Sequence, residues 1–335
     1  MKLLIYTIFL LSFSAFLIFF CRKNIILMNS NGNKHQEFVG SFQTPLIGGI
    51  IVYFSILFFN FYELNLFFIF ITLIFLIGLF SDLKKLNSPN IRILIQIILT
   101  LLCVYLLKID LSVTRINLID FLLKNYIFAL VFTSFCILII MNGTNFIDGI
   151  NSLAIGYYLL ICSALLYLKN NGLNISFYFP LYFMITCLVC IFILNLFNKL
   201  FLGDAGAYLL GFIFSIELIN LYLQNLNISP FFIILLLWYP AFENLFSILR
   251  KINFNKSPVF PDTNHLHQLI FSFFKNKKLS QLKSNNLAGI SINLYNALII
   301  ATSLTDPYNT QLQIILIILN LFVYTFFYMR LFKYR

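Results

Sequence analysis

The sequence has 335 residues, of which 61% are hydrophobic and only 10% are charged, and its mean hydropathy is +0.94. Because soluble domains carry about 25% charged residues, this composition excludes a soluble two-domain enzyme and indicates one polytopic membrane bundle. The formal net charge of +11 does not indicate a nucleic-acid partner, because the basic residues are scattered along the chain and suit the fixing of membrane topology instead.

Apolar runs long enough to cross a bilayer, about 17–25 residues each, predict ten or eleven transmembrane helices. The eleven runs lie near residues 3–21, 45–62, 64–81, 91–108, 126–142, 152–168, 177–197, 205–223, 229–249, 288–304 and 311–332. The first run resembles a signal peptide, but its length and its lack of a cleavage site favour a retained span. We therefore expect an all-α, polytopic helix bundle that forms a single integral-membrane domain over residues 1–335.

The basic residues indicate the orientation of this bundle. With the N-terminus outside, the predicted inner segments hold 17 of the 22 basic residues, so the positive-inside rule places the C-terminus in the cytoplasm. Seven of the 17 lie in 250–287, which we expect to be a large cytoplasmic loop. The unusual polar segments all fall on this face, whereas a transporter is expected to place its ionisable groups near the bilayer midplane. The pattern favours an enzyme at the membrane surface.

The first acidic candidate along the chain is Asp82, where the third predicted span reaches the cytoplasm. It is followed by Lys84 and Lys85, and a charged anchor at the membrane boundary is an equally good interpretation. Earlier in the chain, Pro45 and the pair Gly48-Gly49 open the second span. Paired glycines permit close backbone approach, although a tight turn into the helix also accounts for them.

The segment 142–154, Asn-Gly-Thr-Asn-Phe-Ile-Asp-Gly-Ile-Asn-Ser-Leu-Ala, is a polar island between two apolar runs. Asp148 has an ordinary interpretation as a cap of the next helix. Capping does not account for Asn142 and Asn145, and if the preceding helix continues, both residues share one face with Asp148. Carboxamides can donate to phosphate or ribose oxygens, and a carboxylate can bind a metal or act on a phosphate.

Asp204 opens the eighth predicted span, within Gly203-Asp-Ala-Gly206. An acid at a helix N-terminus is an ordinary N-cap. The functional interpretation is that Asp204 coordinates Mg²⁺ while the glycines let a diphosphate approach.

Two of the three histidines, His265 and His267, lie in the 250–287 segment shortly after Asp262. A zinc site would need further Cys or His ligands nearby, and there are none. Donation to phosphate oxygens fits better, because the basic residues of this segment attract anions. A surface turn is the ordinary alternative. Glu243, inside a predicted span, is a candidate for orienting this segment.

In their order and sidedness, these motifs resemble the polyprenyl-phosphate N-acetylhexosamine-1-phosphate transferases, glycosyltransferase family 4. That family includes undecaprenyl-phosphate GlcNAc-1-phosphate transferases and the phospho-MurNAc-pentapeptide translocase. The resemblance covers five segments: Pro45-Leu-Ile-Gly-Gly49, Ser81-Asp82, 142–154, 201–207 and 261–268. Five positions depart from the family pattern, with Leu46 for an Arg, Ser81 for the first Asp of a pair, Ser152 for a Gly, Thr263 for an Arg and Gln268 for a His.

The resemblance implies transfer of a sugar 1-phosphate from UDP-N-acetylhexosamine to undecaprenyl phosphate, with release of UMP, at the start of a lipid-linked cell-envelope glycan. It implies a Mg²⁺-dependent enzyme, with Mn²⁺ as the alternative ion. It also implies a homodimer in the bacterial cytoplasmic membrane, with its active site facing the cytoplasm. The alternatives are phospho-MurNAc-pentapeptide transfer and a non-enzymatic transporter or scaffold.

The resemblance also implies a role for each site residue. Asp204 is expected as the principal metal ligand, and Asp82 supports the metal or the lipid phosphate. Asp148 is the catalytic carboxylate, either as a base toward the lipid phosphate or as a covalent nucleophile. Because Ser81 cannot act as a base near neutral pH, more of the chemistry depends on Asp148. Substrate binding is expected from five side chains: Asn142, Asn145, Asp262, His265 and His267.

Overall fold

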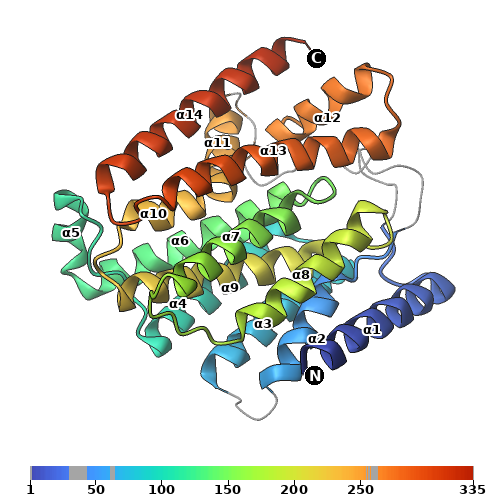
Figure 1. The fold of residues 1–335 in the computed structure, drawn as a ribbon, viewed down its shortest axis with the longest axis horizontal. Coiled ribbons are helices and arrows are strands. Elements are labelled where there is room, and N and C mark those ends of the chain that lie inside the picture. Colours follow the sequence, from blue (N-terminus) through green and yellow to red (C-terminus); the bar gives the residue numbers. More distant parts are fainter. Residues whose placement is uncertain are drawn as a thin grey trace.

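The computed structural model describes residues 2–29, 44–60, 65–253, 255, 257 and 263–334. These residues form fourteen α-helices (Figure 1). They are α1 (Lys2–Asn24), α2 (Gly48–Asn60), α3 (Leu66–Asp82), α4 (Pro89–Leu107), α5 (Asn117–Leu123), α6 (Tyr126–Ile147), α7 (Leu153–Asn170), α8 (Leu181–Leu196), α9 (Gly203–Gln224), α10 (Pro230–Leu236), α11 (Trp238–Asn253), α12 (Leu266–Asn276), α13 (Gln281–Ser303) and α14 (Thr310–Lys333).

The prediction of an all-α polytopic membrane protein is confirmed at this level. Six of the described helices, α1, α4, α6, α7, α9 and α14, are long and apolar enough to cross a membrane, and the bent pair α10 and α11 would make a seventh span. Each of the eleven predicted apolar segments overlaps at least one of the described helices. The predicted segment 126–142 was too short, because α6 continues to Ile147 and carries the polar island onto the helix.

The structure corrects one expectation about the C-terminal third and refines another. The segment 229–249 is not one helix but two, α10 and α11, which meet at an angle of 75°. Pro240 accounts for the break, because it has no N–H to donate and its ring crowds the carbonyl of Leu236, four residues earlier. The segment 250–287 is not simply a loop, since it contains the end of α11, all of α12 and the start of α13.

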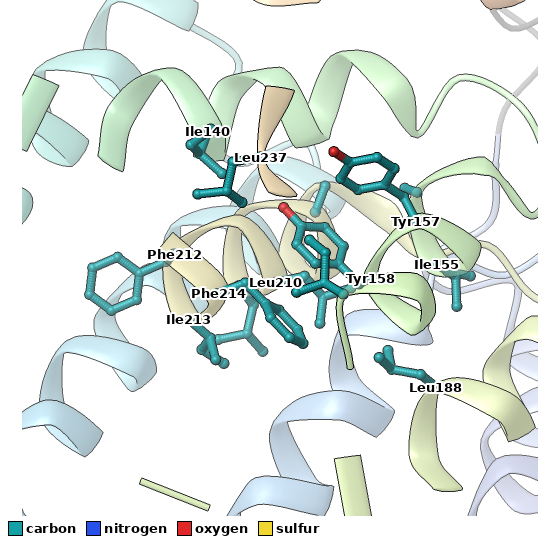
Figure 2. Close-up of a cluster of buried hydrophobic side chains, with 14 of the residues drawn as sticks. Ile140, Ile155, Tyr157, Tyr158, Leu188, Leu210, Phe212, Ile213, Phe214 and Leu237 are labelled. Atoms are coloured by element: carbon teal, nitrogen blue, oxygen red, sulfur yellow. The ribbon is translucent and has the colours of Figure 1, made fainter. Parts of the chain in front are cut away.

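The centre of the bundle is α9, which is almost completely buried. Figure 2 shows Leu210 and Phe214 of this helix beside Tyr158 of α7, while Phe212 points to the other side of the helix. The ring of Tyr158 stacks on Phe214 with 4.7 Å between their centroids. Because α9 packs against α2, α3 and α6, its N-terminal end, where Asp204 lies, is surrounded by other helices.

The first and last helices form opposite sides of the molecule (Figure 1). Each presents exposed aromatic side chains outward, such as Phe16 and Phe19 on α1 and Phe322 on α14. Exposed apolar faces of this kind suit contact with lipid, where every backbone polar group must already be satisfied within the helix.

Glycines bring α2 and α3 against the N-terminal end of α9. A Cβ on Gly49 or Gly78 would collide with the backbone of residues 205–206. The backbone N–H of Gly48 donates to the carbonyl of Phe201 at 2.9 Å, and that of Gly49 donates to Leu202 at 2.9 Å. The predicted close approach of the paired glycines is therefore confirmed. It brings the segment 45–49 against the segment 201–207.

Candidate active site

Asp204 receives hydrogen bonds from three other helices. The Nδ2 of Asn145 on α6 donates to its Oδ1 at 2.6 Å. The Nη1 of Arg92 on α4 donates to Oδ2 at 2.6 Å, and the hydroxyl of Ser81 on α3 donates to the same oxygen. The side chain of Asp204 is nevertheless 29% exposed. The carboxylate is therefore fixed in place and still reachable by a ligand.

Asp82 satisfies the N-terminus of α9. Its Oδ1 accepts from the backbone N–H of Asp204 at 2.9 Å, and its Oδ2 accepts from that of Ala205 at 3.0 Å. A helix N-terminus has unpaired N–H groups and a partial positive charge. A carboxylate from another helix accepts hydrogen bonds from those N–H groups and balances the charge. Gly203 lies at φ +75°, and a Cβ there would come within 2.7 Å of Asp82 Oδ2. The capping interpretation thus belongs to Asp82, which leaves the side chain of Asp204 available.

Asp148 occupies the C-cap position of α6, where its backbone N–H donates to Thr144 at 3.1 Å. It does not cap α7, whose N-cap residue is Ser152. Burial raises the pKa of Asp148 well above its usual range, and the neighbouring charges of Asp204 and Asp82 raise it further. The backbone N–H of Gly203 acts in the opposite direction. The three predicted acidic residues are therefore electrostatic neighbours in the fold.

The turn after Asp148 is held by asparagines that the sequence analysis did not select. Ser152 has a left-handed backbone, with φ +65°, which explains why the family pattern has glycine at this position. The Oδ1 of Asn195 accepts from the backbone N–H of Ser152 at 2.6 Å, and the Nδ2 of Asn293 donates to its carbonyl at 3.0 Å. The Oδ1 of Asn285 accepts from the N–H of Asn151 at 2.6 Å. These contacts come from α8 and α13.

Replacing Ser152 by glycine is expected to raise the free energy of unfolding by about 0.5–1 kcal/mol. A non-glycine residue in the left-handed region costs about 1–3 kcal/mol, part of which the greater backbone entropy of glycine offsets. Thermal unfolding in detergent measures the effect. The matched control is Ser163→Gly in the interior of α7, which should lower stability because glycine weakens a helix. A loss of stability in Ser152→Gly would contradict the interpretation.

The two predicted asparagines have different surroundings. Asn145 contacts Asp204 directly. Asn142, one turn earlier on α6, donates to Gln96 Oε1 at 3.1 Å and to the carbonyl of Leu138 at 3.0 Å. The structure therefore brings Asn145 into the acidic cluster and places Asn142 against α4.

The two histidines lie next to the polar island. A Cβ on Gly149 would come within 2.7 Å of His267 Nε2. The ring of His265 lies 5.5 Å from that of His267 and 5.3 Å from the ring of Phe146, measured between centroids. The segment 142–154 and the histidines His265 and His267 are thus neighbours in the fold. Asp262, the remaining predicted substrate-binding residue, lies outside the described residues.

Gln268 replaces a histidine of the family pattern and has a structural role. Its Oε1 accepts from the backbone N–H of His265 at 3.1 Å, which is the reciprocal contact of a capping box at the start of α12. Glutamine serves this purpose well. The substitution therefore supports the backbone of His265.

Arg92 is the site residue that the sequence analysis left without a role. It is a single charge in the first turn of the apolar helix α4, and it forms an ion pair with Asp204. A lone arginine at the start of an otherwise apolar run is the signal that would have identified it.

A metal would find few protein ligands here. The described part of the chain contains no group of three or more His, Cys, Asp or Glu residues arranged to hold a metal ion. The carboxylates of Asp82 and Asp204 both accept hydrogen bonds at each oxygen, but the side chain of Asp204 is 29% exposed, so a cation can reach it. Such a donor set fits Mg²⁺, which commonly binds through one or two carboxylates and completes its shell with waters and substrate phosphates.

Comparison with known proteins points to one family. The model of glycosyl transferase family 4 matches residues 64–222. A probable undecaprenyl-phosphate N-acetylglucosaminyl 1-phosphate transferase from Bacillus subtilis (strain 168) is 31% identical over 147 residues, which are 43% of this chain and 40% of that protein. An undecaprenyl-phosphate alpha-N-acetylglucosaminyl 1-phosphate transferase from Thermotoga maritima is 25% identical over 226 residues, 67% of each chain.

A third relative carries a different name. A phospho-N-acetylmuramoyl-pentapeptide-transferase from Dictyoglomus thermophilum is 31% identical over 191 residues, which are 53% of this chain and 60% of that protein. The match to the Bacillus protein spans well under half of its length. The family model includes Asp82, Asp148 and Asp204 but ends before the histidines.

Proposed function

We propose that this chain, which belongs to glycosyl transferase family 4 through residues 64–222, transfers an N-acetylhexosamine 1-phosphate from a UDP-sugar to undecaprenyl phosphate and releases UMP. The observation that carries the proposal is that Asp82, Asp148 and Asp204, at the ends of three helices, are electrostatic neighbours, and that His267 lies against Gly149, next to Asp148. The names of the relatives supply the lipid acceptor and the sugar phosphate.

Phosphoryl transfer depends mainly on positioning and on stabilising charge. In the proposed reaction, Asn145 and the histidine pair hold the diphosphate of the nucleotide sugar. Asp148 acts on the lipid phosphate, either as a base or as a nucleophile. Arg92 offsets the charge of Asp204 and, through the hydroxyl of Ser81, links α3 to α4.

Mg²⁺ is the cation we propose for this reaction, with Mn²⁺ as the alternative. Asp204 would hold it, supported by Asp82, and substrate oxygens would complete the shell. When bound, the ion would neutralise charge on two phosphate-bearing substrates.

We also propose the finer topology. Eleven spans with the N-terminus outside would place the acids and the histidines at the cytoplasmic face of the bacterial inner membrane. The distribution of basic residues supports this orientation. A homodimer is the assembly that the family resemblance implies.

Release of UMP from purified protein tests the proposal. The protein would receive undecaprenyl phosphate and Mg²⁺ with UDP-GlcNAc, UDP-GalNAc or UDP-MurNAc-pentapeptide, and a parallel series would contain EDTA. We expect UMP with an N-acetylhexosamine donor and none with EDTA. Release with the pentapeptide donor alone would favour the second candidate, phospho-MurNAc-pentapeptide transfer, which the Dictyoglomus relative supports. No release with any donor would reject both.

A further inference from the structure

Glu243 is a fully buried carboxylate on α11 that the reaction described above does not use. Its Oε1 lies 2.8 Å from Nδ1 of His265 and accepts from the backbone N–H of Leu266 at 3.3 Å. Its Oε2 accepts from the hydroxyl of Tyr324 at 2.8 Å. A carboxylate buried in a membrane protein is costly unless it is paired in this way. Both of its oxygens are therefore committed to donors.

This arrangement determines which nitrogen of His265 carries the proton. Leu266 N–H and the Tyr324 hydroxyl donate to the two oxygens of Glu243, as suits an ionised carboxylate, and an ionised carboxylate can only accept, so Nδ1 bears the hydrogen. In the neutral ring, Nε2 is then left as the acceptor. A carboxylate on Nδ1 also fixes the ring orientation. The contact thus affects both the tautomer and the orientation of the His265 ring.

The acid is itself held by the last helix. Tyr324 is buried on α14, and Tyr328 lies one turn further along the same helix. The Nη1 of Arg250 on α11 donates to the hydroxyl of Tyr328 at 3.1 Å and also to the carbonyl of Asn264. Two tyrosines of α14 therefore hold an acid and a base of α11. That acid and base in turn contact the three consecutive residues 264–266.

We propose that Glu243, anchored by Tyr324, is a positioning residue that sets the proton location and orientation of His265 for phosphate binding. The inference rests on the proposed function, in which His265 contacts the substrate diphosphate. It also assigns a role to α14, because the tyrosines of this otherwise lipid-facing helix support the histidine segment from behind.

The competing interpretation is that Glu243 only stabilises the start of α12. The two interpretations differ in whether removing the Glu243 carboxylate changes the proton location and orientation of the His265 ring. The titratable and charged side chains around the pair, among the described residues, are Tyr239, Arg250 and Lys251 of α11, His267 of α12, and Tyr324 and Tyr328 of α14. A change confined to Glu243 leaves all of them in place.

The test compares Glu243→Gln and Glu243→Asp with the wild type in detergent. The chain has only three histidines, so ¹⁵N-histidine labelling allows the ring nitrogens of His265 to be followed by NMR, with His265→Asn for assignment. In Glu243→Gln we expect the ¹⁵N signals to show a smaller share of the His265 tautomer with hydrogen on Nδ1, because the carboxylate that accepts this hydrogen is gone. We expect kcat/KM to fall by about 10- to 100-fold, the usual effect of removing such a partner. Aspartate should restore part of both.

The matched control is Glu217→Gln, which changes a second buried glutamate that accepts from the backbone N–H of Tyr178 at 3.0 Å. It should leave both the His265 signals and the rate unchanged. If Glu243→Gln does not fold, the same NMR and kinetic measurements are made on Tyr324→Phe. We then expect smaller changes in the His265 signals and in kcat/KM. Unchanged His265 ring-nitrogen signals and wild-type rates in a folded Glu243 or Tyr324 variant would overturn the inference. If the wild type released no UMP, the proposed function would fail while the NMR measurement would still decide the positioning of His265.

Discussion

Replacing Asp204 by asparagine is expected to lower the rate of sugar-phosphate transfer by about 10³-fold, the upper range for removing one preorganised electrostatic group. The reason is the position of this side chain. It is the meeting point of Ser81, Arg92 and Asn145, and it is the carboxylate most available to a cation. The amide of asparagine is neutral and would offer a single acceptor oxygen where the carboxylate offers two. UMP release at saturating substrate measures the loss.

Measuring the thermal stability of Asp204→Asn as well should separate its loss of catalysis from its loss of stability. The Asp204→Asn change would leave Arg92 without the carboxylate that it pairs with in a partly buried setting, 20% exposed, so some destabilisation is expected. Asp306→Asn is the matched control, because Asp306 lies between α13 and α14, where its Oδ1 accepts from the backbone N–H of Tyr308. It should change neither quantity. A wild-type rate in Asp204→Asn would contradict the site assignment.

The sequence predicted the helices and marked the individual acidic residues because both depend on local patterns, whereas the grouping of the acids was implied by the family resemblance. Apolar runs of bilayer length define helices whatever their neighbours are. The polar island of 142–154 marked Asn145 and Asp148 because a membrane helix rarely tolerates such residues without a use. Capping was the point on which local reasoning failed, because the acid that caps α9 comes from α3, about 120 residues earlier in the chain.

Contacts between distant helices were not predictable from one sequence. Tyr324 and Tyr328 are spaced four residues apart on α14, a pattern that shows a shared face but not which helix it meets. Likewise, nothing local connects Asn195, Asn285 and Asn293 to the turn at Ser152. The bend between α10 and α11, unlike these contacts, had a local signal. Pro240 indicated a break in the helix, but the continuous apolar run around it predicted a single span.

Replacing Asp148 by asparagine is expected to reduce the rate by about 10²–10⁴-fold, the range for a general base. The wild-type pH profile should show why. Because burial and the charges of Asp204 and Asp82 raise the pKa of Asp148, a larger fraction is protonated near neutrality than for an ordinary aspartate. If the ionised form is required, the rate should rise with pH through a midpoint well above the usual aspartate range. The residual activity of Asp148→Asn should not show this rise with pH.

Stability should change in the opposite direction from activity. A carboxyl group whose pKa is raised by folding binds its proton more tightly in the folded state, so its ionisation costs stability. That cost is present above the folded pKa and disappears below the unfolded one. Asp148→Asn should therefore unfold at the same temperature as the wild type or a higher one at pH 8, and the difference should shrink toward pH 4. Thermal unfolding at both pH values measures this. A variant that lost both activity and stability at pH 8 would indicate that Asp148 supports the fold of the turn, and the catalytic assignment would then move to Asp82 or Asp204.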